Sequence, residues 1–249
     1  MLEVKQVYKT YRKSGFFSRK RQQILSDVTI EMRKGECLGI VGESGSGKST
    51  LGRIILGIEK PDGGEVLYFG KKVNDRKVRL GHISAVFQDY TSSFNPHFTV
   101  YEVICEPIML QAKNRREDME VKVVDLLYRV GLDESYLKKY SHELSGGEAQ
   151  RVCIARAIST NPDFLLLDEA VSSLDVSVQT QILKLLSQLK NEMNISYLFI
   201  THDIQSVTYL CDRVIFFNEG RVVEQVNIEN LSQVQNDYSK RLLSAVIAF

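Results

Sequence analysis

The chain has 249 residues, of which 43% are hydrophobic and 25% are charged, and its formal net charge is +1. This composition is typical of a globular protein with its own core, and it excludes a disordered or collagen-like chain. The near-neutral charge disfavours a nucleic-acid-binding protein, which normally carries a strong basic excess. One basic stretch, from Arg12 to Arg21, is predicted to be a solvated loop rather than a nucleic-acid or lipid site, because Phe16 and Phe17 are its only apolar residues.

The cysteines and the apolar runs indicate in which cellular compartment the chain works. Four scattered cysteines without a Cys-x-x-Cys pair argue against a zinc site, an iron–sulfur cluster or a disulfide framework, and they fit a reducing cytosol. We expect no signal peptide, because residues 1–10 include charges throughout. We also expect no transmembrane segment, since that needs an apolar run of roughly 20 residues. A membrane role would therefore come through partner chains.

Apolar patterning predicts an α/β chain whose first part alternates strands with a helix. The helix is expected to present Leu51, Ile54, Ile55 and Ile58 on one face and to end at Pro61 and Gly63-Gly64. Residues 90–155 change character and are predicted to be helical near 100–110, near 117–130 with Gly131 as terminator, and again after Ser145. The predicted strands are Leu2–Val7, Val28–Met32, Cys37–Val41, Ser84–Phe87, Phe164–Leu167, Ser196–Ile200, Val214–Phe217 and Arg221–Gln225.

Later helices are predicted along the apolar stripe from Ile182 to Met193, at Ile204–Leu210 and from Tyr238 to Phe249. The short apolar run Phe164–Leu167 is typical of a strand that is buried on both faces. Together these elements predict an α/β core with a mostly parallel sheet, interrupted by a helical insertion.

A glycine-rich octapeptide follows the predicted strand Cys37–Val41 and precedes the predicted helix. It fits G-x-x-x-x-G-K-[ST], in which glycines let backbone N–H groups turn inward around phosphate oxygens. Lys48 would supply charge to the β- and γ-phosphates, and the Ser49 hydroxyl would bind Mg²⁺. A chance match has odds of about 1% at a background glycine usage of about 7%, so a phosphate site is favoured over an accidental glycine-rich turn. The residues predicted at the nucleotide here are Gly42, Glu43, Ser44, Gly45, Ser46, Gly47, Lys48, Ser49 and Thr50.

Polar side chains end three further predicted strands, where ligand sites of open α/β sheets lie. Asp168 and Glu169 end one strand, and the hypothesis is that Asp168 holds Mg²⁺ while Glu169 is the general base toward the attacking water. Taken alone, the pair could equally be a surface acidic pair. His202 could contact the γ-phosphate, and Gln88 could reach the metal and the attacking water, although a single His or Gln at a strand end is more often structural.

The segment Leu144 to Arg151 resembles the signature motif of the ABC ATPase family. Nearly the whole chain is similar to that family, with its motifs in order. The resemblance implies that Tyr11 stacks on adenine, that Gln88 is the Q-loop glutamine and that Asp168 and Glu169 are the Walker B pair. It also implies that Asp175 lies in the D-loop and that His202 is the switch histidine. The signature residues expected at the nucleotide are Ser145, Gly146, Gly147 and Glu148.

The resemblance implies a P-loop NTPase fold and a mechanism. A RecA-like core with an antiparallel β part would cover 1–89 and 156–230, a helical subdomain would cover 90–155, and a tail would cover 231–249 of a single domain, 1–249. Two such domains would face head to tail, with ATP and Mg²⁺ between the P-loop of one and the signature of the other. Hydrolysis would reopen the pair and rock membrane subunits between two access states.

The signature also fits a local rule, because Ser145-Gly146-Gly147-Glu148 matches the S-x-x-E capping box of a helix N-terminus. Ser145 could therefore both cap the helix and donate its hydroxyl proton to phosphate. Glu148 departs from the glutamine that is commonest in the family, and its negative charge could weaken the attraction of phosphate.

The segment around Gln88-Asp89, Ser93-Phe94-Asn95-Pro96 and Glu106-Pro107 resembles the oligopeptide, dipeptide and nickel importer branch of the family, as do the tail 237–246 and the loop between Tyr11 and Ile24. Ala170-Val171 stands where most of this branch has Pro-Thr, and in this the chain resembles the second ATPase subunit of nickel importers. Importers of nickel, cobalt or zinc on opine-type metallophores fit equally well. A peptide importer remains the alternative. The resemblance implies two membrane permeases, a second paralogous ATPase chain (or a homodimer in isolation), an extracytoplasmic solute-binding protein and a place at the cytoplasmic face of the cell membrane.

Three rival functions can be weighed on the sequence. A soluble ABC ATPase of translation or DNA repair usually carries paired cassettes or long coiled coils, and neither is present. A regulatory cassette without hydrolysis would lack Glu169 or His202. An exporter or lipid pump is disfavoured by the region around Asn95-Pro96 and by the tail.

Overall fold

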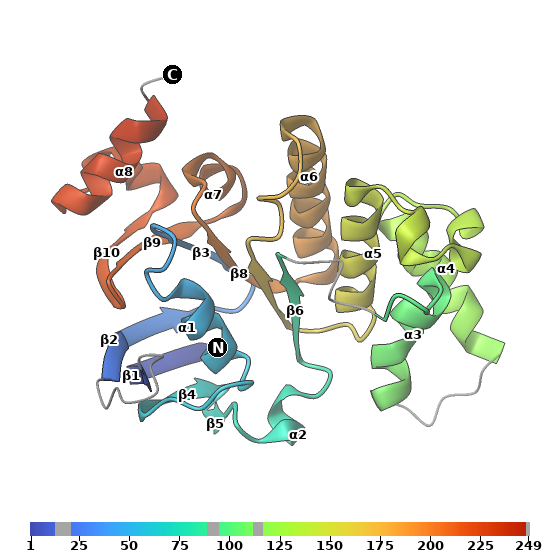
Figure 1. Cartoon of the computed structure of the whole chain (residues 1–249), viewed down its shortest axis with the longest axis horizontal. Helices are drawn as coiled ribbons and strands as arrows, with labels where there is room; N and C mark the ends of the chain where they lie inside the picture. The colour runs from blue at the N-terminus through green and yellow to red at the C-terminus, as the bar shows by residue number, and fades with distance from the viewer. Residues whose placement is uncertain (13–20, 89–94, 112–116, 248–249) are drawn as a thin grey trace. The chain divides into compact units, whose positions relative to one another are not determined.

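The computed structural model describes residues 1–12, 21–88, 95–111 and 117–247 (Figure 1). The chain forms two compact units. Unit 1 is Met1–Arg79 with Ser196–Phe249, and unit 2 is Leu80–Ile195. Of the segments that point to an importer branch, Asp89, Ser93 and Phe94 lie outside the described residues, as does most of the loop between Tyr11 and Ile24. The domain boundaries expected from the sequence stay a prediction.

Unit 1 contains an antiparallel four-stranded sheet with the order β2-β1-β4-β5. Its apolar residues Leu2, Val4 and Val7 are fully buried, as expected for a strand with one face against a core, although a register irregularity between Val4 and Val7 interrupts the alternation. The first two strands are longer than predicted, because their ladder continues as far as the pair Arg12 and Arg21. The strands are β1 (Leu2–Arg12), β2 (Arg21–Met32), β4 (Gly63–Tyr68) and β5 (Lys71–Lys72).

The end of the first helix was predicted wrongly. Helix α1 covers Lys48–Ile55 and stops before Gly57, whose φ of +63° is left-handed and terminates a helix with little strain. Ile58 therefore lies beyond the helix and is 61% exposed. Gly63 and Gly64 begin β4 rather than ending a helix.

A second set of strands in unit 1 has the order β10-β9-β3-β8. β3 (Cys37–Val41) runs parallel to β8 (Ser196–Thr201) and to β9 (Arg213–Asn218), and β10 (Arg221–Asn227) returns antiparallel to β9. Helix α7 (Ile204–Leu210) packs closely on β3. A Cβ at Gly39 would lie 2.9 Å from Cγ1 of Val207, so this close packing requires glycine. The remaining elements of unit 1 are α2 (Arg76–Arg79), η3 (Ile228–Gln233) and α8 (Asp237–Ile247).

Unit 2 holds two parallel strands, β6 (Ile83–Phe87) and β7 (Phe164–Asp168), and the long helix α6 (Val176–Met193). Its helices α3 (Val100–Gln111), α4 (Glu117–Arg129) and α5 (Gly146–Ile158) pack against one another (Figure 1). Two short 3₁₀ helices lie between α4 and α5, namely η1 (Glu134–Lys138) and η2 (Ser141–Glu143).

The predicted fold class is confirmed, with parallel strands, an antiparallel β part and a helical segment. The predicted helices near 100–110 and 117–130 are present, and Gly131 follows the second with a left-handed φ of +77°. Among the residues that the structure describes, no helix is both long and apolar enough to cross a bilayer.

Candidate nucleotide-binding site

The loop between β3 and α1 depends on glycine at three positions. Gly45 and Gly47 have left-handed φ angles of +78° and +106°, which side chains with a Cβ rarely adopt. A Cβ at Gly42 would lie 2.0 Å from the carbonyl oxygen of Phe217, and one at Gly47 would lie 2.9 Å from that of Ile24. The backbone is thus packed closely behind the loop, and glycine alone fits there.

The side chain of Lys48 reaches back across the loop between β3 and α1. Its side chain is almost buried, and Nζ donates to the carbonyl oxygens of Gly42 at 2.7 Å and Glu43 at 2.8 Å. No side-chain cap covers the N-terminus of α1, whose N-cap is Gly47. A cation beside the positive end of a helix attracts an anion, so these residues fit a phosphate group.

The Tyr11 hydroxyl is tied to helix α1 through two neighbours. It donates to the Glu59 carboxylate, with both carboxylate oxygens at 2.7 Å, and it accepts from Nη2 of Arg53 at 3.3 Å. Arg53 also donates to Oγ1 of Thr50 at 3.1 Å. Burial raises the pKa of Glu59, but hydrogen bonds from Tyr11 and Lys9 outweigh it, so the net pKa is lowered and the carboxylate stays charged. This network fixes the position of the Tyr11 hydroxyl relative to α1.

His202 and Gly42 lie at the same edge of unit 1. Val41 pairs with Thr201 in the parallel ladder of β3 and β8, so the next residue of each strand is Gly42 and His202. Asp203 then caps α7 by accepting from the N–H groups of Gln205 at 2.9 Å and Ser206 at 3.2 Å. The cap fixes the backbone directly after His202, whose side chain is exposed.

Unit 2 has an equivalent strand edge. Phe87 pairs with Asp168 in the ladder of β6 and β7, so Gln88 and Glu169 are the next residues of the two strands. Asp168 is nearly buried, at 8% exposed. Glu169 has a left-handed φ of +52°, which costs a residue with a Cβ about 1 kcal/mol. Its carbonyl oxygen accepts from N and Oγ of Ser172 at 3.2 and 3.0 Å, which stabilises this backbone.

The signature segment forms the predicted capping box at the start of α5. Oγ of Ser145 accepts from the N–H of Glu148 at 3.4 Å, and Oε2 of Glu148 accepts from the N–H of Ser145 at 2.7 Å. The other oxygen of Glu148 accepts from the hydroxyl of Tyr136 on η1. The hydrogen bond from Tyr136, followed by those from Ser145, lowers the pKa of Glu148 to about 2. A fixed negative charge therefore stands at this helix N-terminus.

Helix α5 begins close to the start of α6. A Cβ at Gly147 would lie 2.8 Å from Cγ1 of Val178, so glycine permits this approach. Asp175 caps α6, because Oδ1 accepts from the N–H of Val178 at 3.0 Å and from the hydroxyl of Ser177 at 2.8 Å. The signature and D-loop segments of unit 2 are thus two capped helix starts that lie near each other.

Sequence reasoning missed two sets of contacts around the P-loop. Glu59 and Arg53, which hold Tyr11, carry no motif. Tyr238 on α8 contacts the loop through its hydroxyl, which accepts from the N–H of Glu43 at 3.0 Å. Tyr238 and Glu43 are 195 positions apart, and no local pattern in the sequence connects them.

The glycine loop, the strand ends and the capped signature define a P-loop ATPase of the ABC type. The model of the ABC transporter family matches residues 25–172, and the chain belongs to this family as an ATP-hydrolysing subunit.

Two curated proteins and one solved structure of this family are similar to the chain over most of its length. The chain is 49% identical, over all of both chains, to the metal-staphylopine import system ATP-binding protein CntF of Staphylococcus aureus. It is 39% identical to the oligopeptide transport ATP-binding protein OppF of Lactococcus lactis, over 94% of this chain and 76% of that protein. Among solved structures, a dimeric, ADP- and Pi-bound state of the ATP-binding cassette MJ0796 matches with a TM-score of 0.82 and 32% identity, over 92% of this chain and 99% of that chain.

Proposed function

We propose that this ATPase subunit energises the import of a nickel, cobalt or zinc ion, free or bound to an opine-type metallophore. The observation that carries the proposal is the identity of 49% with the metal-staphylopine relative, which extends over the full length of both chains. The oligopeptide relative OppF of Lactococcus lactis is more distant, at 39%, and this chain covers 76% of it.

The proposed residue roles in hydrolysis rest on the motifs of the ABC family and on the chemistry of each side chain. Lys48 and the N-terminus of α1 bind the phosphates, and Tyr11 stacks on the adenine. Mg²⁺ would be held by Ser49, Gln88 and Asp168, which supply the oxygen ligands that it prefers. When bound, it supplies positive charge against the phosphate oxygens.

Glu169 is the general base that polarises the attacking water, with Gln88 beside it at the same strand edge. His202 contacts the γ-phosphate from its strand end in unit 1. The strained backbone of Glu169 supports a functional role, because such conformations cluster at active sites.

A second ATPase chain completes the site. Ser145, Gly146, Gly147 and Glu148 of one chain, with Asp175, are proposed to meet the nucleotide held by the P-loop of the other. Gly146, the first residue of α5, supports this proposal, because a glycine at a helix N-terminus lets a phosphate approach closely, whereas the carboxylate of Glu148 opposes it. We propose a heterodimer with a paralogous chain, and a homodimer where this chain is isolated.

The dimer is proposed to act on two integral membrane permeases at the cytoplasmic face of the cell membrane, with an extracytoplasmic solute-binding protein delivering the solute. A short coupling helix of each permease would dock beside Gln88 and the helices of residues 90–155. Closure on ATP and reopening after hydrolysis would then switch the permeases between two access states.

An uptake assay in cells distinguishes a metal importer from a peptide importer. Cells that lack their own importers would express this chain with its neighbouring genes, and uptake of radioactive nickel with an opine metallophore would be compared with that of a labelled dipeptide. The metal proposal expects nickel uptake that stops in the Glu169→Gln variant. Dipeptide uptake without nickel uptake would replace it with the peptide importer.

A further inference from the structure

The C-terminal helix of unit 1 makes a direct polar contact with the P-loop. Tyr238, in the first turn of α8, is 6% exposed. Its hydroxyl accepts from the backbone N–H of Glu43 at 3.0 Å and donates to the carbonyl oxygen of Phe217 at 3.4 Å. The tyrosine therefore connects α8 with the first turn of the P-loop and with β9.

Hydrogen bonds fix the start of α8, and with it the position of Tyr238. The carboxylate of Glu224 on β10 accepts from the N–H groups of Gln235 at 2.6 Å and Asn236 at 3.1 Å. Oδ1 of Asn236 in turn accepts from the N–H of Tyr238 at 2.9 Å. The helix also packs against α7, β9 and β10. These contacts fix the position from which the Tyr238 ring reaches the loop.

Both backbone groups of Glu43, its N–H and its carbonyl oxygen, make hydrogen bonds that fix the P-loop. Its N–H donates to Tyr238, while its carbonyl oxygen accepts from Nζ of Lys48 at 2.8 Å and from the N–H of Ser46 at 3.3 Å. A rotation of the backbone at Glu43 would therefore move the acceptors of Lys48 and the turn that leads to Gly45. The Tyr238 hydroxyl opposes such a rotation.

We infer that Tyr238 is a positioning residue for nucleotide binding, which acts through Glu43 to fix the P-loop in its phosphate-binding conformation. The inference goes beyond the proposed function, but it rests on the ATP-binding part of it. It assigns the tail a role in nucleotide affinity, whereas packing alone would assign it a role in stability.

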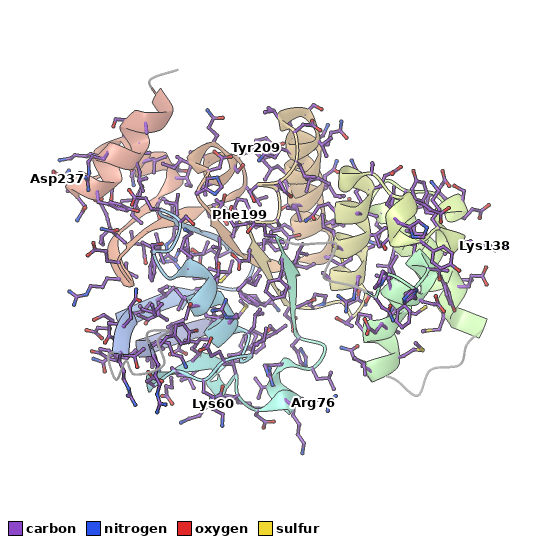
Figure 2. The ribbon with its side chains drawn as sticks, in the orientation of Figure 1. Lys60, Arg76, Lys138, Phe199, Tyr209 and Asp237 are labelled. Carbon is purple, nitrogen blue, oxygen red and sulfur yellow. The ribbon has the colours of Figure 1, made fainter. Side chains whose placement is uncertain are left out.

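The test is the Tyr238→Phe variant of the full chain, which keeps the buried ring and removes only the hydroxyl. The lost hydrogen bond leaves the N–H of Glu43 unpaired, so we expect about three- to ten-fold weaker binding of MgATP and MgADP by calorimetry. The KM for ATP should rise by a similar factor, with kcat unchanged at saturation. The matched control is Tyr209→Phe on α7, at a residue that is 54% exposed and is labelled in Figure 2.

Amide hydrogen exchange supplies a readout without nucleotide. The N–H of Glu43 should exchange faster in Tyr238→Phe than in the wild type, and it should be unchanged in Tyr209→Phe. A wild-type affinity in Tyr238→Phe would overturn the inference. So would a loss of affinity confined to temperatures at which the variant partly unfolds.

Failure of the proposed function is distinguishable from failure of this inference. If the wild type binds MgATP and Lys48→Ala binds it at least about ten-fold more weakly, the ATP site stands whatever Tyr238→Phe does. If the wild type itself fails to bind MgATP, the ATP site and the role of Tyr238 fall together.

Discussion

The ammonium of Lys48 donates to the carbonyl oxygen of Gly42 over 2.7 Å, across the loop that separates the two residues. The lysine thereby stabilises the fold of its own P-loop. The same cation, next to the uncapped start of α1, can attract phosphate. Its charge therefore has both a structural and a binding role.

Lys48→Ala should reduce the affinity for MgATP by at least about ten-fold, because hydrogen bonds to charged groups contribute about 1.5–3 kcal/mol. Calorimetry on the purified chain measures this. Lys71→Ala, on the exposed strand β5, is the matched control and should bind as the wild type does. Retained affinity in Lys48→Ala would remove the assignment of the phosphate site.

His202→Ala should lower the rate of ATP hydrolysis more than the affinity for ATP, because the role proposed for His202 is a γ-phosphate contact at its strand end. We expect the variant to fold, since the side chain is exposed and Asp203 still caps α7. Turnover and calorimetric affinity would be measured in parallel, with His142→Ala on η2 as control. A turnover rate equal to that of the wild type would count against the role.

The sequence predicts the P-loop and the strand edges well, because local rules determine them. A G-x-x-x-x-G-K-S loop between a strand and a helix constrains its own backbone, and a polar residue that ends a strand, such as Gln88, Glu169 or His202, directly follows its own apolar run. The capping box of Ser145 and Glu148 depends on residues three positions apart. Each of these features can be recognised within a short window of sequence.

Contacts between distant segments could not be predicted in this way. The bond between Tyr238 and Glu43 depends on where the tail packs, and the close approach of Gly42 to Phe217 depends on how β9 lies behind the loop. The helix end was misjudged for a related reason. Ile58 continues the apolar period of α1, but the left-handed backbone of Gly57 ends the helix first.

Glu169→Gln should bind ATP, fail to hydrolyse it and accumulate as an ATP-bound dimer, because the amide cannot accept the proton of the attacking water. The substitution keeps the size of the side chain and the same strained backbone, so the melting temperature should not change. Size-exclusion chromatography with and without MgATP detects the dimer. A mutant that turns over normally would reject the base role.

Glu148→Gln should keep or modestly raise ATPase activity. The amide oxygen can still accept from the N–H of Ser145, and the amide nitrogen can donate to the Tyr136 hydroxyl, so the capping box survives without its negative charge. Steady-state hydrolysis measures this, with Glu143→Gln in the neighbouring η2 cap as control. A large loss of activity would mean that the charge itself has a positive role.

The same variant should change how stability depends on pH. The pKa of Glu148 is lowered from 4.5 to about 2 in the folded chain, mainly by the hydrogen bond from Tyr136. A carboxylate with a depressed pKa contributes stability that is fully present above the unfolded pKa and is lost as pH falls through the folded value. The free energy of unfolding of the wild type should therefore fall more steeply between pH 4.5 and about 2 than that of Glu148→Gln. Urea unfolding across that range measures both slopes, and parallel curves would show that the ion at this helix start does not stabilise the fold.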